Sequence, residues 1–279
     1  MKIIKSISEM QAFSCEARST GETIGFVPTM GYLHEGHMSL AREAKAKNAK
    51  SVLSIFVNPT QFGPSEDFAA YPRDMDGDLE KCEKARVDAV FVPDAGEMYP
   101  DGFSTHVDVA GVTDVMEGIR RPGHFRGVAT VVLKLFNAVM PDRAYFGQKD
   151  YQQTVVIRRM TRDLNLDMEV VVMPTVRDPD GLAMSSRNAY LSGPERAAAP
   201  VIYKALSEAG KLYNTGERSA GVIAAKVREV IGGEPMVNIE YAEVSDAETL
   251  APLRQIQTGA VLAVAARIGK TRLIDNILL

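Results

Sequence analysis

The feature that most constrains the fold is the alternation of short β-branched runs with amphipathic stretches through the N-terminal two thirds of the chain. Such alternation is typical of strands joined by crossover helices in a parallel sheet. The predicted strands are 23–27, 51–57, 88–92, 144–146 and 168–173, and the predicted helices are 38–48, 75–86, 128–140 and 151–164. This order of elements predicts the α/β class.

The pattern changes after about residue 176. Helical stretches at 194–214 and 219–231 precede strand-like runs at 237–244, 259–267 and 271–278. Helices followed by adjacent strands are typical of a small α+β unit. The junction at 177–181 reads Arg-Asp-Pro-Asp-Gly, and its Pro and Gly interrupt regular structure. We therefore predict two domains, 1–175 and 176–279, with a hinge near this turn-rich segment.

Composition argues against several classes of protein. A net charge of −4 disfavours nucleic-acid binding, which depends mostly on clustered lysines and arginines. The apolar stretch 128–140 contains Lys134 and Asn137, and it falls short of the ~20 residues of a membrane span. Cys15 and Cys82 are the only cysteines, too few for a disulfide framework. The first ten residues lack the continuous apolar segment of a secretory signal. We expect a cytoplasmic protein with no nucleic-acid or membrane partner.

The segment 28–37, Pro-Thr-Met-Gly-Tyr-Leu-His-Glu-Gly-His, lies between the first predicted strand and the helix that follows it. Ligands of open α/β sheets bind beyond the carboxyl ends of strands, where a helix N-terminus offers free N–H groups to phosphate. His34 and His37 are three residues apart and can face the same phosphate, whose developing charge their N–H groups would stabilise. Gly31 and Gly36 permit close backbone approach. The pattern predicts a phosphate-binding turn.

This turn also permits other interpretations. Ordinary helix-capping histidines remain open on the pattern alone. A metal site would need a third ligand, and His106 and His124 lie in unrelated segments. A Walker-type phosphate loop is rejected because His37 and Met38 stand where lysine and a hydroxyl residue are required. The Gly-x-Gly-x-x-Gly fingerprint of dinucleotide binding is absent from the sequence.

A strand-end His-x-Gly-His turn resembles that of class I nucleotidyltransferases and adenylate-forming synthetases, and six blocks of the chain resemble the pantothenate synthetase family. The blocks are 28–37, 56–64 (Phe-Val-Asn-Pro-Thr-Gln-Phe-Gly-Pro), 71–73 (Tyr-Pro-Arg), 121–125 (Arg-Pro-Gly-His-Phe), 146–153 (Phe-Gly-Gln-Lys-Asp-Tyr-Gln-Gln) and 184–188 (Met-Ser-Ser-Arg-Asn). They follow the family's order and extend from residue 28 to about 190. Departures are small, at Thr60 and Gln148, where some variation is expected.

The resemblance implies a fold and an activity. The fold is a Rossmann-like parallel sheet with a smaller α+β C-terminal domain, in a homodimer. The activity is the ATP-dependent condensation of pantoate with β-alanine through a pantoyl-adenylate, with release of AMP and pyrophosphate and with Mg²⁺ as cofactor. Two alternatives stay open: a nucleotidyltransferase that adenylylates another small substrate, and a non-catalytic nucleotide-binding module. Release of AMP that depends on β-alanine would separate the ligase from both.

The same resemblance implies roles for individual residues. The catalytic residues are His34, His37, Lys149, Ser185 and Arg187, with His37 the usual candidate for proton donor. The ATP contacts are Met30, Gly31, Tyr32, Leu33, His34, Glu35, Gly36, His37, Gly147, Gln148, Lys149, Asp150, Val176, Met184, Ser185, Ser186 and Arg187. Among them Asp150 suits ribose or metal contact and the Val176 backbone would touch adenine. The loop 184–187 resembles a mobile loop that closes on phosphates, and we expect movement of the small domain to complete the site.

Substrate contacts are implied for Gln61 and Gln153, which would bind pantoate and β-alanine. A glutamine amide both donates and accepts hydrogen bonds, which suits a hydroxy acid. Without the family blocks, either glutamine would be interpreted as a surface residue. Asn58, Arg121 and His124 are weaker candidates, and His124 equally fits a turn histidine after Pro-Gly. The sequence leaves the metal ligands unassigned.

Overall fold

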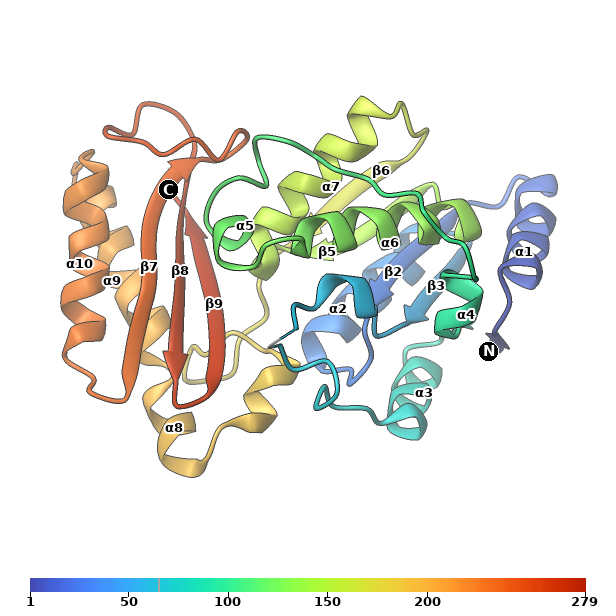
Figure 1. The fold of residues 1–279 in the computed structure, drawn as a ribbon, viewed down its shortest axis with the longest axis horizontal. Coiled ribbons are helices and arrows are strands. Elements are labelled where there is room, and N and C mark those ends of the chain that lie inside the picture. Colours follow the sequence, from blue (N-terminus) through green and yellow to red (C-terminus); the bar gives the residue numbers. More distant parts are fainter. Residues whose placement is uncertain (65) are drawn as a thin grey trace.

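The computed structural model describes residues 1–64 and 66–279, and it contains two sheets (Figure 1). The larger sheet has six parallel strands in the order β1-β4-β3-β2-β5-β6. They are β1 (Lys2–Ile4), β2 (Ile24–Thr29), β3 (Lys50–Ile55), β4 (Ala89–Phe91), β5 (Arg143–Gly147) and β6 (Glu169–Met173). The smaller sheet is antiparallel and consists of β7 (Val237–Asp246), β8 (Ala260–Ile268) and β9 (Thr271–Leu278). The predicted α/β class, with a Rossmann-like sheet, is confirmed.

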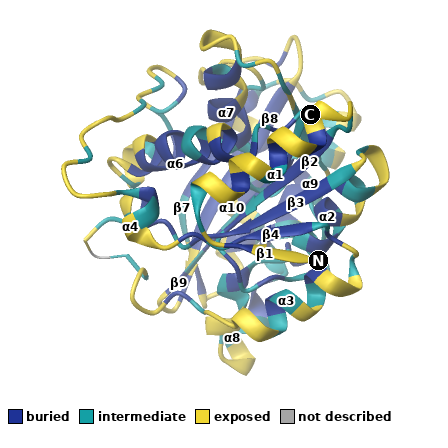
Figure 2. Cartoon of the chain, turned by 90° about the vertical axis from the view of Figure 1, so that its right-hand side faces the viewer, coloured by how far each residue is buried: buried dark blue, intermediate teal, exposed yellow. Residues whose placement is uncertain are grey.

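Helices connect the parallel strands and cover both faces of their sheet. They are α1 (Ile7–Ser19), α2 (Glu35–Lys47), α3 (Met75–Lys84), α4 (Ala95–Met98), α5 (Glu117–Arg120), α6 (His124–Val139) and α7 (Tyr151–Asp163), with short 3₁₀ turns η1 (Pro59–Gln61) and η2 (Gln148–Asp150). Adjacent residues of each strand point to opposite faces. In β2, Phe26 packs with Phe136 of α6, whereas Val27 packs with α2 and α3. Burial on both faces explains the near-continuous apolar strands (Figure 2).

The strand order places a ligand crevice between β2 and β5. Strand β2 pairs with β3 on one side and with β5 on the other. From β2 the chain continues to β3 and β4 on one side of the sheet, and from β5 it continues to β6 on the other side. The boundary between β2 and β5 is therefore a topological switch point. The histidine turn follows β2 and η2 follows β5. Both segments consequently lie at the carboxyl edge of the sheet, where open α/β folds bind ligands.

The C-terminal sheet packs on both of its faces. Helices α8 (Gly193–Ala198), α9 (Val201–Asn214) and α10 (Ala220–Gly232) follow the 3₁₀ turn η3 (Ser186–Tyr190), and α9 and α10 cover the outer face (Figure 1). On the inner face, Tyr241 and Val261 join the same apolar cluster as α6 and α7. Arg272 of β9 donates to both carboxylate oxygens of Glu117 at 2.6 and 2.7 Å, and Tyr241 Oη donates to Glu117 at 2.8 Å. These contacts attach β7 and β9 to α5.

The division into domains 1–175 and 176–279, and the hinge between them, stay predictions. The hinge segment itself is held by side-chain contacts. Arg177 donates to both oxygens of Asp275 at 2.6 and 2.9 Å. Asp178 and Asp180 both accept from Arg196, at 3.0 and 2.6 Å. These ion pairs attach the segment to α8 and β9.

Several predicted boundaries were wrong in informative ways. The sequence patterns did not predict β1 and α1, so the histidine turn follows the second strand and not the first. The predicted helix 194–214 is two helices, α8 and α9, because Pro200 interrupts it. Helices α2 and α6 begin earlier than predicted, which places His37 and His124 in their first turns. Among the described residues, no helix has the length and apolar character of a membrane span.

Candidate active site

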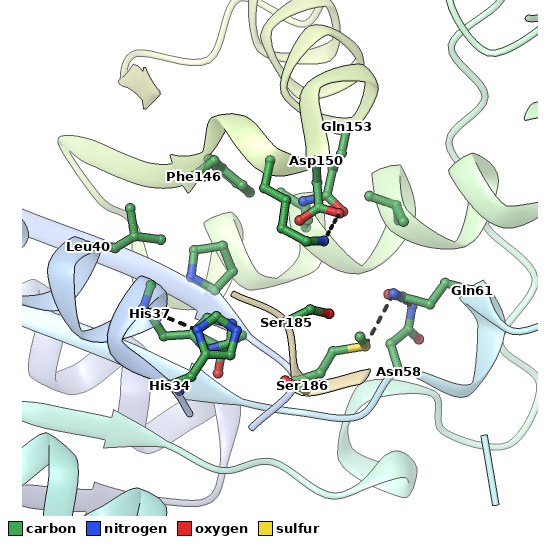
Figure 3. A pocket seen from close by; sticks show the side chains of 18 of the residues that line it. His34, His37, Leu40, Asn58, Gln61, Phe146, Asp150, Gln153, Ser185 and Ser186 are labelled. Carbon is green, nitrogen blue, oxygen red and sulfur yellow. Dashed lines mark hydrogen bonds and ion pairs between the residues drawn. The ribbon is translucent and has the colours of Figure 1, made fainter. Parts of the chain in front are cut away.

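A cavity of about 220 Å³ lies at the switch point between β2 and β5. Figure 3 shows His34 and His37 on one side, Gln61 and Asn58 on the other, and Ser185 between them. The predicted site residues that line the cavity are Met30, His34, Gly36, His37, Asn58, Gln61, Arg121, His124, Gly147, Lys149, Asp150, Gln153, Val176, Met184, Ser185, Ser186 and Arg187. The structure thus brings together residues from blocks that are far apart in the sequence.

Some predicted ATP contacts lie outside the cavity lining, namely Gly31, Tyr32, Leu33, Glu35 and Gln148. Leu33 is buried in the apolar cluster beneath α2 and α3. Glu35 is exposed and forms an ion pair with Arg42. The Gln148 amide nitrogen donates to Asn276 Oδ1 at 3.4 Å. For these residues, contact with ATP stays a prediction from the resemblance.

Two consecutive residues of the turn before α2, Gly31 and Tyr32, have positive φ angles. The φ angle is +81° at Gly31 and +49° at Tyr32. A Cβ at Gly31 would lie 2.9 Å from Ile55 Cγ2 and 3.0 Å from Asp78 Oδ2, so the position requires glycine. Asp78, at the α3 surface that faces the turn, accepts hydrogen bonds from the N–H groups of Tyr32 and Leu33 at 2.7 and 2.6 Å. The carboxylate therefore fixes the direction in which the chain enters α2.

His34 and His37 are oriented by the N-terminal hydrogen bonds of α2. The Gly36 N–H donates to His34 Nδ1 at 3.1 Å, and the His34 N–H donates to His37 Nδ1 at 3.3 Å. The ring centroids are 4.0 Å apart. Because a backbone N–H can only donate, both Nδ1 atoms are acceptors, and a neutral ring must carry its proton on Nε2. Each imidazole therefore has one N–H donor left for a ligand.

Burial keeps both imidazoles neutral. The pKa of His34 is lowered from 6.5 to about 4, first because burial disfavours the cation and then because Lys149 is nearby. The pKa of His37 is lowered well below 6.5 by burial and by the neighbouring His34. The cavity therefore has two kinds of polar group beside each other, the amine of Lys149 and two neutral imidazoles, each with an N–H at Nε2.

We expect His34 to remain unprotonated between pH 7 and about 5, since burial lowers its pKa to about 4. Burial lowers the pKa of His37 in the same direction. The unfolded chain takes up protons near the ordinary histidine value of 6.5, before the native chain does. The contribution of His34 to the free energy of unfolding is therefore complete above pH 6.5 and declines as the pH falls toward 4, and that of His37 also declines as the pH falls below 6.5. Nitrogen-15 NMR of the imidazoles tests this, with the exposed His106 as internal control. Titration of His34 near 6.5 would contradict it.

Lys149 follows β5 and occupies the middle of η2. Its side chain is 18% exposed, and its Nζ lies 3.5 Å from Asp150 Oδ1, a loose ion pair. Both side chains line the cavity, as does the backbone of Gly147. A partly buried ammonium whose carboxylate partner among the described residues is at 3.5 Å and not hydrogen-bonded is suited to bind the phosphates of a nucleotide.

The side chains around Gln61 form a supporting network. Asn58 Nδ2 donates to Gln61 Oε1 at 3.1 Å, and Gln61 Nε2 donates to Met30 Sδ at 3.3 Å. His124 bonds with the Gln61 carbonyl at 2.9 Å and with Arg121 Nη1 at 3.1 Å. Since arginine can only donate, His124 accepts at Nε2 and donates from Nδ1. Both ring nitrogens of His124 are thus engaged, and the residue orients Gln61 from the first turn of α6.

The loop 184–187 contacts both sides of the cavity. Ser186 Oγ donates to the Tyr32 carbonyl at 3.2 Å, next to the histidine turn. The Met184 N–H donates to the Val176 carbonyl at 3.0 Å. Arg187 donates to both oxygens of Asp67 at 2.8 and 3.0 Å. Binding of a phosphate by Arg187 would therefore require this guanidinium to exchange its partner.

Some residues that line the cavity were not assigned a role in the site from the sequence. Val128, Val131, Val132 and Leu135 of α6 form an apolar wall, and Tyr71, Phe146 and Thr175 also line the cavity. The four α6 residues follow the spacing of any buried helix face, so the sequence offers no sign that they border a ligand site. Thr175 Oγ1 is buried and has no hydrogen-bond partner in the described part of the chain, which leaves it available to a ligand.

Comparisons with known proteins identify the family of this chain. The family model described as "Pantoate-beta-alanine ligase" matches residues 2–278. A pantothenate synthetase of Pelotomaculum thermopropionicum is 54% identical over 279 residues, which cover 100% of this chain and 99% of the relative.

Two solved structures of the same family resemble this chain over nearly its whole length. The crystal structure of pantothenate synthetase from Thermus thermophilus has a TM-score of 0.95 at 47% identity and covers 99% of both chains. That of the pantoate-β-alanine ligase of Francisella tularensis, complexed with "Beta-gamma ATP" and β-alanine, has a TM-score of 0.81 at 33% identity, over 100% of this chain and 97% of that one. With a family model that spans almost the whole sequence, this chain belongs to the pantoate-β-alanine ligase family.

Proposed function

We propose that the cavity between β2 and β5 activates pantoate with ATP and then joins it to β-alanine. The observation that carries this proposal is the convergence of three kinds of group on one cavity: neutral imidazoles, an ammonium, and the amides of Gln61 and Gln153. The first two suit a triphosphate, and the amides suit a hydroxy acid. The Francisella relative, whose structure holds an ATP species and β-alanine, supports the same substrates here.

ATP would lie along the turn after β2, with its phosphates toward His34, His37 and Lys149. The Nε2–H groups of both histidines are unused by the protein's capping bonds and would donate to phosphate oxygens. Ser185 and Arg187 would add donors to the leaving pyrophosphate. The ribose would contact Gly147 and Asp150, and the adenine would contact the backbone at Val176. Thr175 Oγ1 is buried and has no hydrogen-bond partner among the described residues, which supports placement of a polar base beside Val176.

Pantoate would bind between the two glutamines. The Gln61 amide now donates to a thioether sulfur, a weak acceptor, so a hydroxyl or carboxylate oxygen would replace this contact favourably. Gln153 lines the same cavity from the first turn of α7. The apolar wall formed by Val128 and Val131 of α6 suits the two methyl groups of pantoate.

The chemistry then proceeds in two steps. A pantoate carboxylate oxygen attacks the α-phosphorus of ATP in line, the bond to the bridging oxygen of the β-phosphate breaks, and pyrophosphate leaves. The unprotonated amine of β-alanine next attacks the acyl carbon, AMP leaves with the former carboxylate oxygen, and the nitrogen loses a proton. The chain's contribution to the first step is charge stabilisation by Lys149, Arg187 and the two histidines. For the second step, holding the reactants together can supply roughly 7 to 11 kcal/mol.

Magnesium fits this site only as a partner of the nucleotide. Among the described residues, no group of three or more His, Cys, Asp and Glu side chains is arranged to hold a metal ion. Mg²⁺ commonly binds through one or two carboxylates together with substrate phosphates, and Asp150 provides such a carboxylate at the cavity. The ion would supply positive charge to the triphosphate.

The substrate assignment is tested with purified protein, ATP, Mg²⁺ and pantoate, incubated with and without β-alanine. Sustained release of AMP and pyrophosphate in equal amounts only when β-alanine is present is the expected result. Pyrophosphate release without amine-dependent AMP would favour a nucleotidyltransferase that acts on another acceptor. Tight ATP binding without either product would favour a nucleotide-binding module.

A homodimer in the cytoplasm, with domains 1–175 and 176–279, completes the proposal. The family resemblance supports the dimer, and Cys15 and Cys82, both free thiols, suit a reducing compartment. Light scattering at micromolar concentration distinguishes a dimer from a monomer. Limited proteolysis near 177–181, with and without ATP, tests the domain boundary.

A further inference from the structure

Asn276 lies near the end of β9, outside the six blocks quoted in the sequence analysis, and yet it contacts the turn η2 at the cavity. Its Nδ2 donates to the carbonyl oxygens of Gln148 and Lys149 at 3.0 and 2.9 Å. Its Oδ1 accepts from Gln148 Nε2 at 3.4 Å. The side chain is buried, with 2% of the residue exposed. The hydrogen bonds of this amide are therefore directed at η2, the turn that contains Lys149.

The alternation of side chains along β9 explains this placement. Leu273 and Ile277 pack with the apolar cluster of α9 and α10. Arg272, Ile274 and Asn276 point to the opposite face, where Arg272 binds Glu117 of α5 and Ile274 packs against the N-terminal core. Of these three side chains, that of Asn276 lies beside η2. A register change of one residue would remove it from the turn.

The turn that Asn276 contacts has few other restraints. η2 is three residues long, and within the described part of the chain its start has no side-chain cap. The Lys149 side chain has only the loose 3.5 Å contact with Asp150 among the described residues. A flexible lysine in such a turn would sample many positions, and its ordering has an entropic cost. Two hydrogen bonds to consecutive carbonyls fix the backbone from which the lysine side chain extends.

We propose that Asn276 is a positioning residue that holds Lys149 in the orientation in which its ammonium meets the phosphates of ATP. The role of Lys149 in this statement rests on the proposed function. The small C-terminal sheet thus supports the nucleotide site through hydrogen bonds from β9 to the backbone of η2. This support does not depend on any movement of the C-terminal domain. No contact between Asn276 and the ligand is needed.

Asn276→Asp is the sharpest substitution because it keeps the shape of the side chain. The carboxylate loses both N–H donors and faces two carbonyl oxygens, which repel it. We expect the rate of pyrophosphate formation to fall roughly 10- to 100-fold, as for a misplaced catalytic group, with the KM for pantoate little changed. Asn238→Asp, the same change at an exposed position of β7, is the matched control and should leave the rate unchanged.

A double-mutant cycle separates positioning from a structural role. If Asn276 acts through Lys149, the Asn276→Asp change should reduce the rate strongly in the native background and less than about twofold in a Lys149→Ala background. Equal fold-losses in both backgrounds would overturn the proposal. Asn276→Ala, which removes the donors without adding charge, is carried through the same cycle in case the aspartate variant does not fold.

The cycle is also run on ATP affinity by calorimetry, which does not depend on pantoate. Coupling between the two positions in ATP affinity supports the proposal, and independent effects overturn it. A native chain that releases no pyrophosphate from ATP and pantoate contradicts the proposed function, and the affinity cycle then still decides the role of Asn276. The experiments therefore distinguish failure of the proposed function from failure of the proposed role of Asn276.

Discussion

His37→Ala is expected to lower the rate of adenylate formation by roughly 100- to 1000-fold, the usual loss on removal of one donor to developing charge. The physical reason is the fixed tautomer: His37 Nδ1 accepts the His34 N–H at 3.3 Å, so the ring presents Nε2–H to the cavity as a neutral donor. Pyrophosphate release in single-turnover experiments measures this step. His106→Ala, at an exposed position outside the cavity lining, is the control and should keep the native rate.

Two further substitutions of His37 distinguish the role of its Nε2–H donor from that of its Nδ1 acceptor, which caps α2. His37→Asn keeps a polar atom near the Nδ1 position, so it preserves the start of α2 but not the donor. His37→Gln places an amide N–H near the Nε2 position and is expected to recover part of the rate. If the asparagine variant were as active as the native chain and the glutamine variant as inactive as alanine, the helix cap and not the donor would be what matters.

Gly127→Ala is expected to raise the KM for pantoate roughly 10- to 100-fold through displacement of Gln61. Gly127 is in the first turns of α6, where a Cβ would overlap the Thr60 carbonyl oxygen and lie 2.7 Å from Gln61 Cα. Asn58 Nδ2 also donates to the Gly127 carbonyl at 3.2 Å, so the strand-end segment and the helix cannot separate without loss of this contact. Steady-state kinetics with varied pantoate measures the effect.

Stability should fall in the same variant. Overpacking costs about 1 to 3 kcal/mol. Because the new Cβ would overlap backbone atoms of Thr60, we expect a cost near the upper end of this range, above the gain of about 1 kcal/mol from replacing a helical glycine with alanine. Gly221→Ala in α10 is the matched control, because its Cβ would meet only Ser219 Oγ among the described residues, at 3.9 Å. That control should keep its KM and be equally or more stable. A folded Gly127→Ala protein with unchanged KM would show that close packing at Gly127 does not position Gln61.

Strand and helix periodicity predicted the sheet and its ligand edge because both depend on local patterns. The turn after β2 and η2 after β5 were recognised from their own residues. By contrast, β1 is only three residues long and offers no extended apolar run. The helix after it did carry a local signal, the capping box of Ser6 and Glu9, which our predictions did not use.

Other features depend on tertiary contacts that no local pattern records. Arg187 suits a phosphate, but its pairing with Asp67 joins segments that are far apart in the chain. His124 was an open choice between ligand contact and turn residue, and its hydrogen bonds to Arg121 and Gln61 give it a supporting role. Asn276 looks like any polar residue of a strand until β9 is placed beside η2. Local chemistry and the family resemblance predicted the groups that would meet a ligand, and the fold was needed to show which residues hold them in place.

In the proposed mechanism, pantoate is activated by transfer of its carboxylate oxygen to the α-phosphate of ATP. The most direct test is to supply pantoate labelled with oxygen-18 in its carboxylate, together with ATP, Mg²⁺ and β-alanine, and to measure the label in the products by mass spectrometry. We expect one labelled oxygen in each AMP released and none in pyrophosphate. AMP without label, or labelled inorganic phosphate formed together with ADP, would contradict it.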